Sequence, residues 1–269
     1  MRRSLRSISF NGHARGFTLV EVVVVLIIAA ILVSVALRSG MQINDAAKVE
    51  ETKAELESLE YGIVGNPLVQ NNGVRADFGY VGDVGALPPD LDALAANPGG
   101  YATWRGPYVK TRFTQLAEDY KRDAWGELYT FNGSGMTIRS SGSGDNIDRT
   151  IGNSAGDLLR NMITGNLFDV DGTPPGATYD DSIQLYITIP NGTGGTATKA
   201  VNPNASGYFE IDSIPIGNHV LSAVYLPGDD TLATIIPILP GSDAHVELRF
   251  NDNLWGAVAT SGIIPVHNS

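Results

Sequence analysis

One apolar run near the N-terminus limits what this chain can fold into more than any other feature. From Phe17 to Leu37 the sequence FTLVEVVVVLIIAAILVSVAL contains a single ionisable side chain, Glu21. About 20 predominantly apolar residues are enough to cross a bilayer as a helix. A carboxylate inside such a segment is costly, so it indicates a functional site and needs a cationic partner. The run therefore predicts a membrane-spanning helix with Glu21 as a candidate site residue.

Charge is distributed unevenly around this run. The first 16 residues, MRRSLRSISFNGHARG, carry four arginines and no acid, and basic residues before a first span place that end in the cytoplasm. The whole chain has a net charge of −11, and a cut after Gly16 would leave 14 Lys and Arg against 29 Asp and Glu, or −15. Such an acidic chain argues against nucleic acid as a partner. The absence of cysteine excludes disulfides and thiolate chemistry.

Two ordinary explanations of the N-terminus are a secretory signal peptide and a plain signal anchor. Both explain basic residues followed by apolar ones. The apolar run is about twice the usual length of a signal-peptide core, which disfavours the first. Neither explains an acidic residue at position 21.

The residues Gly16-Phe17-Thr18-Leu19-Val20-Glu21, behind a short basic leader, resemble the cleavage and methylation site of type IV pilins and type II secretion pseudopilins. The resemblance implies that a prepilin peptidase cuts after Gly16 and methylates the new amine of Phe17. The cut creates a cation at Phe17, with which Glu21 of a neighbouring subunit can pair. A buried ion pair is tolerated when both partners are satisfied, and this pair would set the axial register. Gly16 and Phe17 are thus predicted processing residues, and Glu21 an assembly residue.

The polar sequence beyond the apolar run keeps a helical spacing. Apolar residues recur among Lys and Glu at Val49, Leu56, Leu59 and Ile63, which predicts an amphipathic helix. We expect one helix over 17–64, apolar all round in its first half and packed on a globular head in its second.

The next segment resembles the core of the major pseudopilin of type II secretion. Its aromatic residues are expected in the core rather than in a ligand site. Strands at Glu127–Phe131 and Met136–Ser140, with a turn at Asn132-Gly133, predict a small antiparallel sheet. The pieces that carry the resemblance are WRGPY at 104–108, DAWGELY at 123–129 and IRSSG at 138–142.

The loop SSGSGDNIDRT, residues 140–150, is the one candidate ion site. Oxygen-bearing side chains and carbonyls in a Gly-rich turn suit Ca²⁺, which takes 6–8 oxygen ligands, and the resembled family binds calcium in this loop. The alternative is a turn capped by its own side chains. The candidate calcium ligands are Asp145, Asp148, Ser141 and Ser143.

The C-terminal part of the chain alternates apolar strands with Gly and Pro punctuation, which predicts a β-sandwich. The stretches ITGNLFDVDGTPPGAT and GYFEIDSIPIGNHVLSAVY resemble a carboxypeptidase-regulatory-like, transthyretin-type β-sandwich over about 160–250. That resemblance implies a structural or binding module. Strands are predicted at Ile183–Ile189, Tyr208–Ile211, His219–Tyr225, Thr231–Ile238 and Ala244–Phe250.

Together these patterns predict an α+β chain, with a long N-terminal helix packed on a small antiparallel pilin-like sheet and followed by an all-β sandwich domain. The expected divisions are a leader at 1–16, a helix at 17–64 with its transmembrane part at 17–37, a head at 65–152, a sandwich at 160–250 and a tail at 251–269.

No catalytic motif is present: the sequence has no Gly-rich phosphate loop, no G-x-S-x-G and no H-E-x-x-H. His219 and His245 fall in strand patterns and are expected at the surface or an edge, not as metal ligands. The prediction is therefore a structural subunit of a type IV pilus-like filament and not an enzyme.

The expected location is the inner membrane, crossed once, with the head in the periplasm and a filament after assembly. The expected partners are further copies, other pilin-like subunits, a prepilin peptidase and an inner-membrane assembly platform. Two alternatives stay open. One is a binding or adhesion protein whose sandwich recognises a surface, protein or carbohydrate, and the other is an anchored protein that never polymerises.

Overall fold

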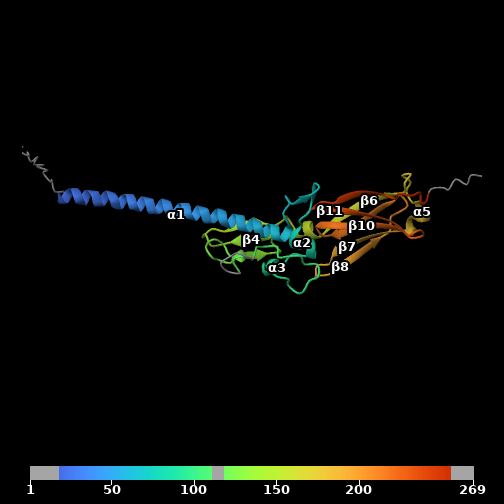
Figure 1. The fold of residues 1–269 in the computed structure, drawn as a ribbon, viewed down its shortest axis with the longest axis horizontal. Coiled ribbons are helices and arrows are strands. Elements are labelled where there is room, and N and C mark those ends of the chain that lie inside the picture. Colours follow the sequence, from blue (N-terminus) through green and yellow to red (C-terminus); the bar gives the residue numbers. More distant parts are fainter. Residues whose placement is uncertain (1–17, 111–117, 256–269) are drawn as a thin grey trace, which may run out of the picture. The chain divides into compact units, whose positions relative to one another are not determined.

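The computed structural model describes residues 18–110 and 118–255 and has the α+β class that the sequence predicts (Figure 1). It opens with one long helix, α1 (Leu19–Val64), and continues with short helices and four antiparallel or mixed sheets. The chain divides within α1 into two compact units, Met1–Lys48 and Val49–Ser269.

The last turns of α1 belong to the second unit and carry part of its core. Leu56, Leu59 and Ile63 are each at most 2% exposed, at the helical spacing seen in the sequence. The helix ends after Val64 because Gly65 takes a φ of +82°, which favours glycine, and its N–H donates to the Tyr61 carbonyl at 2.8 Å.

The head follows α1 and is built from short elements around a small sheet. Strand order in that sheet is β3-β4-β5, all antiparallel. The predicted hairpin is therefore present. The elements are β1 (Gln70–Asn71), β2 (Val74–Arg75), α2 (Gly79–Val84), α3 (Asp92–Ala95), η1 (Asp119–Lys121), β3 (Thr130–Asn132), β4 (Thr137–Ser140), β5 (Ile147–Thr150) and α4 (Ala155–Leu159).

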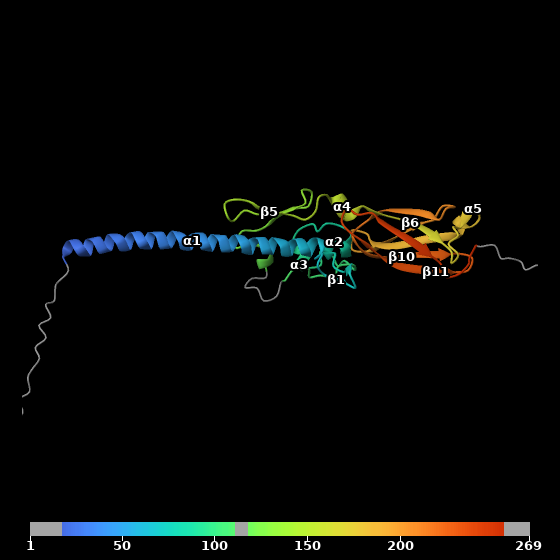
Figure 2. The same cartoon turned by 90° about the horizontal axis from the view of Figure 1, so that it is seen from above.

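The C-terminal β region, residues 161–250, holds two further sheets (Figure 2). One has the order β11-β10-β7-β8 and is antiparallel; the other has the order β12-β6-β9, with β12 parallel to β6. The elements are β6 (Asn161–Phe168), α5 (Gly176–Tyr179), η2 (Asp180–Ser182), β7 (Ile183–Pro190), β8 (Thr196–Val201), β9 (Tyr208–Ile214), β10 (Gly217–Tyr225), β11 (Asp230–Ile238) and β12 (Ala244–Arg249).

Side chains from both of these sheets share one core. Alternate residues along β6, β7 and β10 are buried, as the two-residue period of a strand requires. Ile187, Phe209, Leu221 and Leu248 belong to the same apolar cluster although they come from different sheets. The five strands expected from the sequence are all present, and the structure adds β6 and β8.

The head and the C-terminal β region form a single compact unit, because turns of the β region pack against and hydrogen-bond to the head. Ile216, in the turn between β9 and β10, is fully buried in the apolar core of the head. Its N–H donates to the Leu158 carbonyl at 2.9 Å, and the Asn218 side chain donates to the Arg75 carbonyl at 3.0 Å. The Gly192 N–H also donates to the Val84 carbonyl at 2.8 Å.

Candidate assembly site

Glu21 lies in the first turn of α1, where Thr18 caps the helix. The Glu21 N–H donates to the Thr18 hydroxyl at 3.2 Å, and the Val22 N–H donates to the Thr18 carbonyl at 3.1 Å. A threonine followed three residues later by a glutamate is the pattern of a capping box. An acid in the first turn is also favoured by the helix dipole. Thr18 therefore fixes the start of the helix and the place of Glu21 on it, a role that the sequence analysis missed.

The Glu21 carboxylate is exposed, and no ion pair to it is found within residues 18–110 and 118–255. Gly16 and Phe17, the predicted processing residues, lie outside the described residues. The expected contact between Glu21 and the Phe17 amine stays a prediction.

The apolar residues after Glu21 are exposed on every side of the helix. Those from Val22 to Leu37 that carry large side chains are between 45% and 64% exposed. An 18-residue window of α1 has a mean hydropathy of 3.1 and none of it is buried, so this helix is long and apolar enough to cross a membrane. A helix that is hydrophobic all round requires an apolar environment, either lipid or other helices.

Two of the four candidate calcium ligands have hydrogen-bond partners within the protein. Asp148 lies in β5 and forms a two-pronged ion pair with Arg139 of β4, at 2.6 Å and 2.7 Å. The Arg139 hydrogen bonds hold the pKa of Asp148 below its ordinary value. The Ser143 hydroxyl donates to the Asp145 carbonyl. The expectation that residues 147–150 are loop was wrong, because Ile147 to Thr150 pair with β4.

Asp123 is the carboxylate that organises this loop. It is 5% exposed and accepts hydrogen bonds from the Ser140 hydroxyl at 2.6 Å and from the Gly142 N–H at 3.0 Å. The N–H groups of Trp125 and Glu127 also donate to it, each at 3.0 Å. Burial would raise the pKa of Asp123, but these four donors outweigh burial and the pKa is lowered.

Asp123 was visible in the sequence as the first residue of the DAWGELY piece, but nothing there indicated that it holds a loop 17 residues further on. Within the described residues no group of three or more His, Cys, Asp or Glu side chains could hold a metal ion. Calcium binding by Asp145, Asp148, Ser141 and Ser143 stays a prediction.

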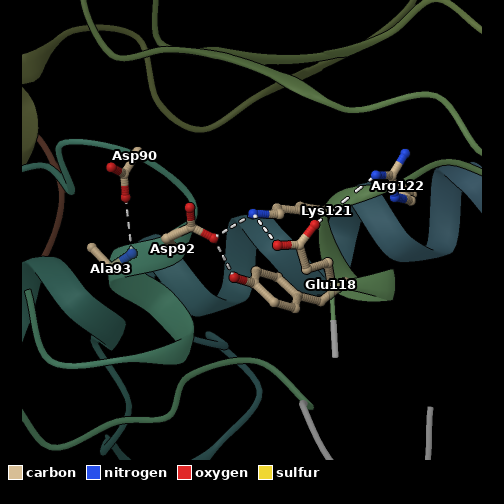
Figure 3. Close-up of polar contacts among 7 residues, drawn as sticks. Asp90, Asp92, Ala93, Glu118, Lys121 and Arg122 are labelled. Carbon is tan, nitrogen blue, oxygen red and sulfur yellow. Dashed lines mark hydrogen bonds and ion pairs between the residues drawn. The ribbon is translucent and has the colours of Figure 1, made fainter. Parts of the chain in front are cut away.

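A second polar cluster joins η1 to α3 (Figure 3). The Lys121 ammonium lies 2.8 Å from Asp92 and 3.5 Å from Glu118, and the Tyr120 hydroxyl donates to Asp92 at 2.6 Å. The hydrogen bonds from Lys121 and Tyr120 lower the pKa of Asp92. Asp92 and Glu118 each pair with Lys121, and Tyr120 donates to Asp92. Because these groups satisfy one another, the cluster suits a structural role.

The two strand histidines differ in environment. The expectation of a surface or edge position was wrong for His219, which is 4% exposed and whose Nε2 lies 2.8 Å from the Pro215 carbonyl. Burial lowers the pKa of His219. His245 is exposed, and its Nδ1 lies 3.2 Å from the Thr164 hydroxyl.

Comparisons with known proteins bear on the N-terminal segment first. The family model of the prokaryotic N-terminal methylation motif matches residues 11–37, which contain Gly16, Phe17 and Glu21. The N-terminal part of this chain is pilin-like.

A type II secretion system core protein G from Xanthomonas campestris pv. campestris is 26% identical to this chain over 185 residues. The match covers 68% of this chain and 98% of the relative.

A solved structure, the dioxygenase domain of a dioxygenase carbohydrate-binding protein fusion from Streptomyces sp. SirexAA-E, is 12% identical. The match covers 36% of this chain and 82% of the chain in that structure, with a TM-score of 0.26. A TM-score this low supports no conclusion about the C-terminal β region.

Proposed function

We propose that this chain is a structural subunit of a type IV pilus-like filament, most like a type II secretion pseudopilin. The observation that carries the proposal is the match to a type II secretion core protein over 98% of that protein's length. The methylation motif at residues 11–37 and the exposed apolar turns of α1 also support it.

Assembly would proceed through the apolar helix. Burying one large aliphatic side chain contributes about 1.5–3 kcal/mol, and α1 exposes many of them between Leu19 and Leu37. Packing such helices against each other outside the bilayer would keep this surface from water. The polymer would then be held together mainly by its helices.

Glu21 would set the register of that packing. A carboxylate among apolar helices is stable only with a cationic partner. A prepilin peptidase cutting after Gly16 would supply one, the methylated amine of Phe17. Thr18 holds Glu21 in the first helical turn, close in sequence to this new terminus. The Glu21 of one copy would thus meet the Phe17 amine of the next.

The proposed location follows from the same segment. The arginines before Gly16 would stay in the cytoplasm, and the apolar turns would cross the inner membrane once. The unit from Val49 onward would then lie in the periplasm. An inner-membrane platform and other pilin-like subunits would be the assembly partners. Calcium bound at the 140–150 loop remains part of this proposal.

The experiment that tests the proposal compares two conservative variants within α1. Glu21→Gln should leave membrane insertion unchanged but abolish filaments recovered by shearing and electron microscopy. Glu50→Gln is the control, because Glu50 is an exposed acid on the same helix and pairs with Lys53 at 2.7 Å. Filaments formed by Glu21→Gln at the wild-type level would contradict the assembly role.

A further inference from the structure

The outer face of the four-stranded sheet carries no charged side chain. Strand register places the outward residues of β7, β8, β10 and β11 in adjoining rows, for example Val220 beside Ile235 and Tyr186 beside Ala200. The neutral face, as we call it, consists of Gln184, Tyr186, Thr188, Pro190, Thr196, Thr198, Ala200, Asn218, Val220, Ser222, Val224, Thr231, Ala233, Ile235 and Pro237.

The three-stranded sheet of the same region provides the contrast. Its outward side chains include Glu210 and Asp212 on β9 and Glu247 and Arg249 on β12, all exposed. The two faces are built from strands of the same domain and belong to a chain of net charge −11. The absence of charge from one of them is therefore a local feature and not a property of the composition.

Apolar side chains on the neutral face are open to solvent. Val220 is 51% exposed and its cross-strand partner Ile235 is 65% exposed. A cluster of exposed apolar side chains on a folded surface marks an interaction site. At its end nearest the head, the face borders a hollow of about 750 Å³ that Thr188, Thr196 and Asn218 line together with Asp83 and Arg105 of the head.

The charge of the chain indicates what covers this face. Two copies cut after Gly16, each with 14 Lys and Arg against 29 Asp and Glu or −15, repel each other, and like charges placed together across an interface cost several kcal/mol. A face without charge is where such copies can approach without that cost. A basic partner would instead be expected on the acidic surfaces. Carbohydrate-binding faces present exposed aromatic rings, and the neutral face offers only Tyr186, which is half-buried.

We propose that the neutral face packs against a neighbouring copy of this chain in the assembled filament. The inference rests on the proposed function, because the apolar helices bring copies side by side. It adds a second contact between subunits, outside α1 and made by the C-terminal β region. A contact between unlike surfaces of successive copies propagates as a helical polymer, as a filament requires.

Site-specific photo-cross-linking in membranes of cells that produce the full chain tests the proposal. The probe, p-benzoylphenylalanine, replaces Ile235 on the neutral face, and in a control chain it replaces Tyr208, which is 38% exposed on the three-stranded sheet. A third chain carries the probe in place of Val25, 58% exposed in the apolar part of α1. Mass spectrometry of each adduct identifies the captured protein.

The proposal predicts adducts between two copies from the Ile235 probe and at least tenfold fewer from the Tyr208 probe. Val220→Asp should lower the yield of the Ile235 probe about tenfold and leave the Val25 probe unchanged. Adducts from Val25 but not from Ile235 would overturn this inference and leave the filament proposal standing. Equal yields from Ile235 and Tyr208, or capture of a different protein by Ile235, would also overturn it. No adduct between copies from either Val25 or Ile235 would contradict both proposals.

Discussion

The Tyr129 hydroxyl donates a hydrogen bond of 2.6 Å to the carboxylate of Glu55, joining α1 to the head. Tyr129 is 7% exposed, and the neighbouring Thr52 on α1 is fully buried and accepts from the Ala124 N–H at 3.2 Å. This polar contact lies beside the apolar packing of Leu56 and Leu59. The last turns of α1 are thus held to the head by both polar and apolar contacts.

Removing the Tyr129 hydroxyl should weaken this attachment. Tyr129→Phe leaves a half-buried carboxylate without its donor, and we expect a loss of about 1–2 kcal/mol in the free energy of unfolding. Urea denaturation measures the loss. Tyr208→Phe is the matched control, since Tyr208 donates to Glu210 at the surface and its hydroxyl should contribute little. Equal losses for the two variants would contradict the account.

Tyr129→Phe should also change how the free energy of unfolding depends on pH. Burial raises the pKa of Glu55 above its ordinary value of 4.5, and the Tyr129 hydrogen bond opposes that rise. A raised carboxyl pKa gives stability that is complete below the unfolded pKa and is lost as the pH rises through the folded pKa. Tyr129→Phe should raise the pKa of Glu55 in the folded protein further. The loss in free energy of unfolding that the variant causes should therefore be small below pH 4.5 and grow above it.

Asp123→Ala should destabilise the head by about 2–4 kcal/mol, because a buried hydroxyl and three backbone N–H groups lose their acceptor. The pKa of Asp123 is lowered from its ordinary 3.8, so its stabilising effect is present above pH 3.8 and is lost as the pH falls through the folded pKa. The difference between wild type and variant in urea denaturation should therefore narrow in acid. Asp145→Ala, in the exposed loop that Asp123 supports, should cost less than about 0.5 kcal/mol.

The junction between the head and the C-terminal β region should be sensitive to one methyl group. A Cβ added at Gly85 would lie 2.5 Å from the Pro190 carbonyl oxygen, at a φ of +78°. Gly144 has a φ of +89° with nothing within 4 Å of an added Cβ, so it carries only the backbone penalty. That penalty is about 1–2 kcal/mol, and the overlap at Gly85 should add about 1–3 kcal/mol more. Equal shifts in Tm for Gly85→Ala and Gly144→Ala would contradict the predicted overlap with the Pro190 carbonyl oxygen.

Calcium binding by the 140–150 loop makes a distinct prediction. Asp148 is held by Arg139, so a site that uses it must break this ion pair. If the loop binds Ca²⁺, millimolar calcium should raise Tm by mass action, magnesium should raise it less, and Asp145→Asn should remove the effect. A Tm that is the same in calcium and in chelator would contradict the calcium prediction while leaving the filament proposal untouched.

The long helix and the strands of the C-terminal region could be predicted because their apolar residues follow simple periods. The spacing of Leu56, Leu59 and Ile63 gives the buried side of α1. The alternation in β7 and β10 gives their inward faces. Edge strand β8, with the sequence TATKAV, is exposed at most positions and has no apolar alternation, so no pattern revealed it.

The contacts that the sequence could not predict are those between distant elements. The alternation of β10 puts His219 on the inward side, but its burial also depends on the Pro215 turn and on the head packed beside it. Ile216 lies among the strands of the C-terminal region in the sequence, yet its side chain packs in the apolar core of the head. Asp148 is a good calcium ligand by residue type, and only the register of β4 and β5 shows that Arg139 lies opposite.

Mass spectrometry of the N-terminal peptide of the native, membrane-extracted protein tests the central claim most directly. The account predicts a chain that begins at Phe17 with a methylated amine, which supplies the cation that Glu21 requires. A peptide that still contains Met1 and the arginines before Gly16 would contradict the filament subunit and leave Glu21 without its proposed partner.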